Sequence, residues 1–269
     1  MTFRVRLILI AIVSVLSFSS SSYAAKVEVL RYAGATTLQR DFMREAAHRF
    51  SAVNPVDFKI EGGNSGAGIK ALSAGLIDLA GSGRFLTAQE KAAGLVEHLL
   101  GWDPLVVVVH ATNPIENISL ENLQRMVSGE VRNWNQVGGR DFPLLQVAAP
   151  KGSGVREVVE QLLTENKHLA PQAIVSLVVA DADRNVALLP ASFTVTSLSM
   201  VDVDKVKIIK VNGILPDHKT VSVGEYPLIK PLLIITKGKP KGQLALFVNF
   251  AKSAEGQAIL ALKFIPLTK

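Results

Sequence analysis

Residues 56–72, VDFKIEGGNSGAGIKAL, decide the fold of this chain. Apolar and polar residues alternate from Val56 to Glu61, which predicts a strand, and Ile69 and Leu72 then fall on one face of a helix. The loop between them, residues 62–68, consists of small residues that let a ligand approach the unpaired N–H groups at the start of the helix. The helix dipole adds partial positive charge there. This strand–loop–helix unit predicts an α/β fold with a candidate site for a small anion.

Two more loops of small residues and hydroxyls occur in the chain, at residues 34–37 (GATT) and 151–154 (KGSG). Each precedes residues with helical spacing, and Thr36 or Thr37 is the predicted N-cap of the first of these helices. A single loop of this kind is usually an ordinary helix cap. Three of them predict a cradle for a small oxyanion if the fold brings them together.

Strand and helix patterns alternate along the rest of the chain. Strands are predicted near residues 27–32, 76–80, 145–147, 206–211 and 232–236. Residues 105–109 (LVVVV) form a continuous apolar run, typical of a strand that is buried on both faces. Strands that alternate with helices predict an α/β fold with mostly parallel sheets.

The first residues have the pattern of an export signal. Arg4 and Arg6 precede an apolar run of about a dozen residues, which is shorter than the ~20 residues that span a bilayer, and residues 19–24 are small and polar. We therefore predict a cleaved signal peptide at residues 1–24 and a periplasmic mature protein. The chain has no cysteine, so its stability rests on its core rather than on disulfides.

Charge and motifs exclude several classes of function. The formal net charge is +6 and falls to +4 without Arg4 and Arg6, a balance that suits an anionic small ligand. Basic runs with interleaved aromatic residues, as expected for nucleic-acid binding, are missing from the sequence. Residues 66–71 (GAGIKA) fit a dinucleotide-binding pattern, but the acidic residue expected about 20 positions later does not follow a strand. The five histidines are scattered and Ser65 lacks the nucleophile-elbow pattern, so no metal, cofactor or catalytic residue is predicted.

An ordered set of motifs resembles the periplasmic phosphate-binding proteins of high-affinity ABC transporters, the PstS-like substrate-binding family. The resemblance covers nearly all of the mature chain in the family's order. It includes three loop segments, the signature NWNQVGG, the loop GSG followed by Arg156, and two C-terminal signatures. These motifs lie at residues 34–36, 64–70, 78–84, 133–139, 152–157, 226–232 and 253–257.

The resemblance implies a two-lobed periplasmic-binding-protein fold of type II with a ligand cleft between the lobes. One lobe would comprise residues 25–107 and 225–269, and the other residues 108–224, with hinge crossings near Val108 and Tyr226. Closure of the lobes on an anion would couple binding to recognition by an ABC permease at the inner membrane. A monomer without cofactors is expected. The ligand-binding residues expected from the loops and the resemblance are Thr36, Thr37, Asn64, Ser65, Gly66, Ser82, Arg84, Lys151, Gly152, Ser153, Gly154 and Arg156.

The chain departs from the family at three positions. Ala149 stands where the family commonly has an arginine, and Val155 stands where it has a threonine. Gly83 replaces an aspartate that accepts the phosphate proton in some members. Lys151, Arg156 and Arg84 are the candidates for the missing positive charge.

Two classes of function remain. The first is a non-enzymatic receptor that captures phosphate, or a related tetrahedral oxyanion, and delivers it to a transporter. The second is an exported module with a signalling or adhesion role that has kept the fold and lost tight anion binding, which the three departures motivate. A phosphatase is a weaker idea, because the sequence shows no metal cluster and no activated nucleophile.

Overall fold

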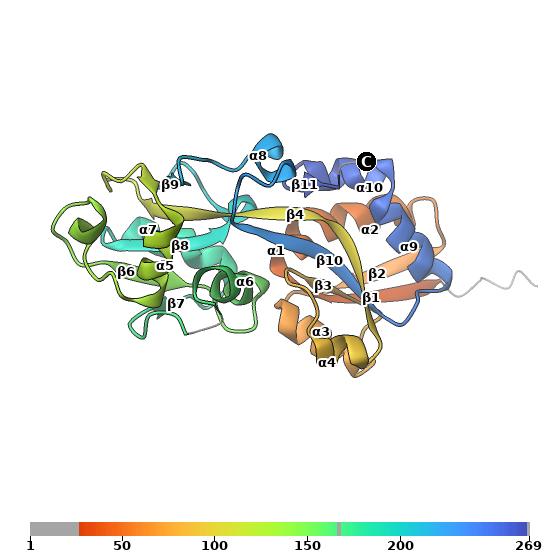
Figure 1. The fold of residues 1–269 in the computed structure, drawn as a ribbon. Coiled ribbons are helices and arrows are strands. Elements are labelled where there is room, and N and C mark those ends of the chain that lie inside the picture. The colour runs from red at the N-terminus through yellow and green to blue at the C-terminus, as the bar shows by residue number, and fades with distance from the viewer. Residues whose placement is uncertain (1–26, 166–167, 268–269) are drawn as a thin grey trace, which may run out of the picture.

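Two lobes stand side by side and are joined by long strands that run between them (Figure 1). The computed structural model describes residues 27–165 and 168–267. The predicted signal peptide therefore lies outside the described residues. Within those residues, no helix is both long and apolar enough to cross a membrane.

The first lobe is built on a sheet with the strand order β2-β1-β3-β10-β4. β1 pairs in parallel with β2 and β3, whereas β10 pairs antiparallel with β3 and β4. The strands are β1 (Glu28–Gly34), β2 (Val56–Ile60), β3 (Leu79–Ser82), β4 (Leu95–His110), β10 (Ile229–Lys237) and the short β11 (Ile265–Pro266), which pairs with β4. The helices are α1 (Thr36–Leu38), the π-helical turn η1 (Gln39–Met43), α2 (Arg44–Ser51), α3 (Ser65–Ser73), α4 (Ala88–Ala92), α9 (Gly242–Lys252) and α10 (Ala254–Ala261).

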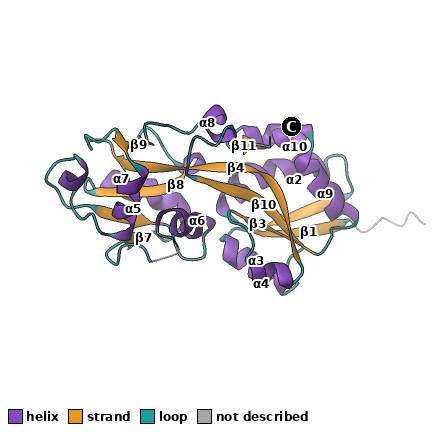
Figure 2. Cartoon of the chain, viewed as in Figure 1, coloured by secondary structure: helices purple, strands orange, loops and turns teal. Residues whose placement is uncertain are grey.

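Alternate residues of β10 explain why helices cover both faces of this sheet (Figure 2). Leu232 and Ile234 pack into a core with α1, α2, α9 and α10, whereas Leu233 and Ile235 pack against α3 from the other side. Successive side chains of a strand point to opposite faces, so a strand covered on both faces reads as one apolar run. The predicted apolar stretch at residues 232–236 has this cause.

The second lobe is built on strands β6, β7, β8 and β9, which are joined to the first lobe through β4. β6 pairs in parallel with β7 and β8, and β4 pairs antiparallel with β8 and β9. The strands are β5 (Asn117–Ile118), β6 (Leu145–Ala148), β7 (Ile174–Val175), β8 (Ser192–Ser197) and β9 (Val206–Val211). The helices are α5 (Leu120–Ser128), α6 (Gly154–Leu163), α7 (Ala182–Leu188) and α8 (His218–Ser222), with 3-10 turns η2 (Trp134–Val137), η3 (Val179–Asp181) and η4 (Leu198–Met200).

β4 belongs to both lobes. Its pairing with β10 reaches Pro104, and its pairing with β8 begins at Leu105. Val107 packs toward α5 and α6, and Val106 packs toward α7 on the opposite face. All five residues 105–109 are 0% exposed, so the predicted burial of this strand on both faces is confirmed. The predicted two-lobed α/β fold is also confirmed.

Candidate functional site

Three helix N-termini meet at one small cavity between the lobes. α1 and α3 come from the first lobe, and α6 comes from the second. The cavity has a volume of about 20 Å³, and a single water needs about 10–15 Å³ on this scale, so the space left between the lobes is small. Its lining residues are Ala35, Thr36, Thr37, Asn64, Gly83, Ser153, Gly154, Val155, Val179 and Lys230.

The start of α1 supplies free backbone donors. Its N-cap is Ala35, which has no side-chain oxygen, and no side-chain hydrogen bond caps this end. The predicted N-cap at Thr36 or Thr37 is therefore wrong. Thr36 Oγ1 instead donates to the Gly63 carbonyl at 2.8 Å, and Thr37 is the first-turn residue whose hydroxyl faces Lys230. The first N–H groups of a helix have no partner within the helix, so those of Thr36 and Thr37 are open to a ligand.

The second loop uses its N–H groups in the cap of its own helix and in a contact with the other lobe. Asn64 caps α3, because its Oδ1 accepts from the Ala67 N–H at 2.8 Å. Ser65 is 0% exposed, and its Oγ accepts from the Gly83 N–H at 3.0 Å. The hydroxyl hydrogen of Ser65 is not used in this bond and remains available to another acceptor. The Gly66 N–H donates to the Gly152 carbonyl at 3.0 Å, which links the first lobe to the second.

The third loop forms the N-terminus of α6. Ser153 caps the helix by accepting from the Arg156 N–H at 3.2 Å, and its own hydroxyl donates to the Pro150 carbonyl at 2.8 Å. The Ser153 hydroxyl is therefore used within the loop, and the N–H groups of Gly154 and Val155 are the donors that the helix start leaves open. A Cβ on Gly154 would lie 2.8 Å from the Gly83 backbone, so glycine is required for the two loops to touch.

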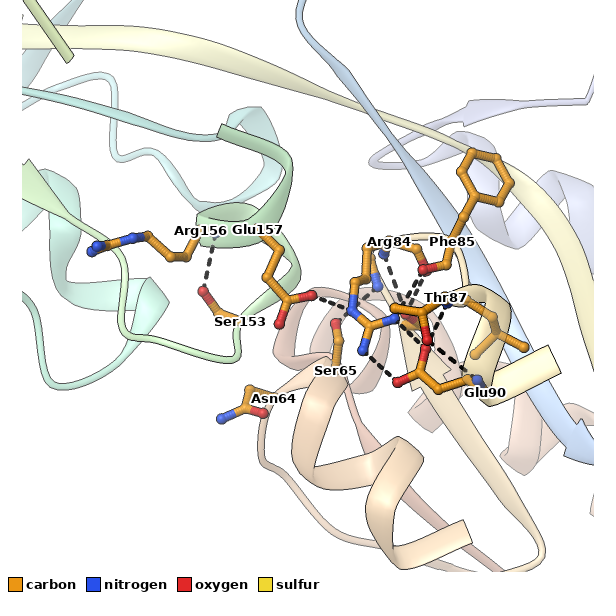
Figure 3. A network of polar contacts seen from close by, with 12 residues as sticks. Asn64, Ser65, Arg84, Phe85, Thr87, Glu90, Ser153, Arg156 and Glu157 are labelled. Atoms are coloured by element: carbon orange, nitrogen blue, oxygen red, sulfur yellow. Dashed lines mark hydrogen bonds and ion pairs between the residues drawn. The ribbon is translucent and has the colours of Figure 1, made fainter. Parts of the chain in front are cut away.

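The three basic residues predicted as anion ligands do not line the cavity. Arg84 makes a two-pronged contact with Glu90, at 2.7 and 2.8 Å, and an ion pair with Glu157 across the lobes (Figure 3). Arg156 points away from the loops and pairs with Glu160 at 2.6 Å. Lys151 is exposed and is not among the residues that line the cavity.

Burial and pairing shift the carboxylates around Arg84 in opposite directions. Hydrogen bonds from the Arg84 guanidinium lower the pKa of Glu90. The pKa of Glu157 is raised, mainly because burial between the lobes disfavours its ionised form more than Arg84 favours it. The Arg84 network thus joins the lobes beside the cavity without presenting a free cation to it.

The structure sorts the predicted site residues into three groups. Thr36, Thr37, Asn64, Ser153 and Gly154 line the cavity. Ser65, Gly66 and Gly152 lie directly behind the lining, in the contacts described above. Ser82 is 0% exposed and bonds to the Arg84 backbone, and like Arg84, Lys151 and Arg156 it does not line the cavity.

Lys230 lines the cavity, although no pattern in the sequence predicted it there. It lies on β10 opposite Asp103 of β4, is 1% exposed, and lines the cavity. Its Nζ is 2.6 Å from Asp103 Oδ2 and donates to Thr37 Oγ1 at 3.3 Å. The available signal was a lone lysine within the apolar run that follows Pro227, because a charge in a buried strand needs a partner or a function.

This fold and cavity define a class. The chain is a two-lobed binding protein, with crossing strands between the lobes and a small cavity at the point where three helix N-termini meet. A family model described as a PBP superfamily domain matches residues 19–255. The chain belongs to this family.

Known relatives share both sequence and structure with this chain. The phosphate-binding protein PstS of Bacillus subtilis is 27% identical over 262 residues, which cover 94% of this chain and 87% of the relative. A phosphate-bound putative phosphate ABC transporter substrate-binding protein from Clostridium perfringens is 27% identical, with a TM-score of 0.83, covering 90% of this chain and 100% of that one. An ABC-type phosphate transport receptor from Vibrio cholerae is 26% identical, with a TM-score of 0.76, covering 89% of this chain and 100% of that one.

Proposed function

We propose that this protein captures phosphate, or a related tetrahedral oxyanion, between its two lobes and delivers it to an ABC transporter. The observation that carries the proposal is the convergence of the N-termini of α1, α3 and α6 on one cavity. Each N-terminus offers the positive end of a helix dipole, and those of α1 and α6 also offer open N–H donors, which together favour an anion. The names of the relatives point to the same ligand and the same kind of transporter.

The two lobes would close on the anion. We infer that residues 25–107 with 225–269 form one lobe and residues 108–224 the other, with the hinge in β4 and in the chain that leads into β10. The bond from the Gly66 N–H to the Gly152 carbonyl and the Arg84–Glu157 ion pair both join the lobes. Both contacts support a closed arrangement around the ligand. Opening would release the anion to a permease in the inner membrane.

The protein is proposed to act as a periplasmic monomer and not as an enzyme. The lining residues of the cavity include no histidine and no carboxylate that could serve as a general base. A signalling or adhesion role without anion binding is less well supported, because the similar proteins are phosphate receptors by name.

The test is isothermal titration of inorganic phosphate into purified protein that has been stripped of bound anions by unfolding and refolding. We expect saturable heat with one site per chain, and chloride at matched ionic strength should give none. A stabilisation of about 2.7 kcal/mol is expected at a hundredfold excess over the dissociation constant. No heat and no thermal shift at millimolar phosphate would overturn the proposal.

A further inference from the structure

We propose that Lys230 is the cationic ligand of the bound anion, and that buried Asp103 is the residue that positions it. This inference rests on the proposed function. Of the residues that line the cavity, Lys230 is the one with a charged side chain. The arginines and the lysine that the sequence suggested for this role are paired elsewhere or exposed.

The ammonium group of Lys230 has a donor to spare. A lysine ammonium has three N–H donors. Among the described residues, Nζ contacts Asp103 Oδ2 at 2.6 Å and Thr37 Oγ1 at 3.3 Å. The third donor remains for the cavity that the side chain lines. Thr37 links this ammonium to the first turn of α1, so the cation and the helix N-terminus face the same space.

Gly83 gives Lys230 room to reach the cavity. A Cβ at position 83 would lie 3.2 Å from Lys230 Nζ and 3.5 Å from its Cδ. The first of these distances is tighter than a relaxed contact, so any larger residue would push against the end of the lysine. The absence of a side chain at Gly83 and the inward reach of Lys230 are therefore two parts of one arrangement.

Asp103 binds the ammonium group of Lys230 on the side that does not face the cavity. It is 0% exposed and does not line the cavity. Ser197, the last residue of β8, donates its hydroxyl to Asp103, with Oγ–oxygen distances of 2.6 and 2.8 Å. The carboxylate is thus satisfied from both sides, and the buried pair presents its positive end to the cavity. Two buried charges in such a pair avoid the large desolvation cost of an unpaired one.

The test compares phosphate affinity in wild type and in the double variant Lys230→Met/Asp103→Asn. The double variant removes both charges together, so no unpaired buried charge threatens folding. Because hydrogen bonds to charged groups are stronger than neutral ones, we expect phosphate affinity to fall at least about tenfold. Recovery of affinity in Lys230→Arg, which keeps the charge, is the readout that a merely structural role of Lys230 would not give.

Two further variants separate the roles. Lys230→Arg keeps the charge and should bind phosphate more tightly than the double variant. Asp103→Glu keeps both charges but moves the carboxylate and with it the ammonium, so phosphate affinity should fall although no charge is lost. The matched control is Lys239→Met, which removes an exposed lysine outside the cavity and should change affinity less than about twofold.

The outcomes distinguish this inference from the proposed function. If wild type does not bind phosphate, the proposed function itself fails. If wild type binds and the folded double variant binds with the same affinity, Lys230 is not a ligand and this inference alone is overturned.

Discussion

Lys230 and Asp103 stand directly opposite each other on the antiparallel strands β10 and β4, with Nζ 2.6 Å from Oδ2. These are the two long strands that cross near the centre of the molecule in Figure 1. β4 changes its pairing partner from β10 to β8 between Pro104 and Leu105, one residue beyond Asp103. The ion pair therefore lies where the lobes are joined, and Lys230 lines the cavity there.

Substitution of Gly154 by alanine should hinder the contact between the lobes. A Cβ there would lie 2.8 Å from both the Gly83 backbone and Ser65 Oγ, and these atoms belong to the opposite lobe. We expect phosphate affinity to fall at least about tenfold while the ligand-free protein keeps its unfolding temperature, because each lobe can fold without this contact. Titration calorimetry and thermal unfolding measure the two quantities.

Gly66→Ala provides a graded comparison for Gly154→Ala. Its Cβ would lie 3.3 Å from the Gly152 carbonyl oxygen, so a shift of a few tenths of an ångström would accommodate it. The loss of affinity should therefore be smaller than in Gly154→Ala. Equal affinities in wild type and Gly154→Ala would show that the lobe contact is not part of the binding state.

A negative charge at Ser153 should repel the anion without breaking α6. Aspartate and asparagine are both good N-caps, so Ser153→Asp and Ser153→Asn should keep the helix start. Only the aspartate adds a poorly screened charge beside the cavity. We expect Ser153→Asp to bind phosphate at least about tenfold more weakly than Ser153→Asn. Matching affinities in the two variants would remove this loop from the site.

The raised pKa of Glu157 predicts how stability depends on pH. Burial is the main cause of the shift, so the folded protein holds the Glu157 proton more tightly than the unfolded chain does. Between the ordinary value near 4.5 and the raised value, folded protein binds more protons, and the Glu157 contribution to stability falls as pH rises. In urea unfolding, Glu157→Gln should therefore gain stability relative to wild type as pH rises through this window. A relative loss would contradict this account.

Glu90 provides the control of opposite sign. Its pKa is lowered, chiefly by hydrogen bonds from Arg84, so its contribution is present above the ordinary value near 4.5 and is lost as pH falls through the lowered value. Glu90→Gln should therefore be less stable than wild type at neutral pH, and the difference should shrink in acid. The two variants thus act in different pH windows, which unfolding measured from acid to neutral pH can separate.

Selectivity for phosphate over sulfate should be lower than in a site that contains a carboxylate. The lining residues include no acid, so a fully ionised dianion such as sulfate meets no like charge. We expect sulfate to compete measurably with phosphate in titrations at fixed ionic strength. Gly83→Asp and Gly83→Asn should both weaken binding by crowding Lys230. Only Gly83→Asp should weaken sulfate more than phosphate, because monohydrogen phosphate can donate a hydrogen bond to the new carboxylate and sulfate cannot. Phosphate binding that a large excess of sulfate leaves undisturbed would contradict this reading.

Local patterns in the sequence were enough for the α/β class, for several strands and for the loops, whereas the two lobes were predicted from the family resemblance. The alternation at residues 56–61 and the glycine-rich loop after it predicted β2 and the start of α3, and the apolar run at 105–109 predicted a strand buried on both faces. These features depend on residues close together in the chain. For the same reason the sequence indicated which loops begin helices.

Long-range pairing explains what the sequence could not give. Lys230 and Asp103 become neighbours only through the register of β10 on β4, which no local pattern encodes. Arg84 was expected near the anion, but its side chain meets Glu157 because α6 comes from the other lobe. The antiparallel crossing strands likewise follow from the way the chain returns to the first lobe after β9, and not from the composition of any strand.

The central claim is that a tetrahedral oxyanion sits among the three helix N-termini and Lys230. The most direct measurement is a crystal structure of the protein grown with arsenate, a tetrahedral oxyanion whose arsenic can be located by anomalous scattering. We expect one strong anomalous peak in the cavity, with the arsenate oxygens within hydrogen-bonding reach of the N–H groups of Thr37 and Gly154 and of Lys230 Nζ. An empty cavity, or a peak only at the protein surface, would contradict it.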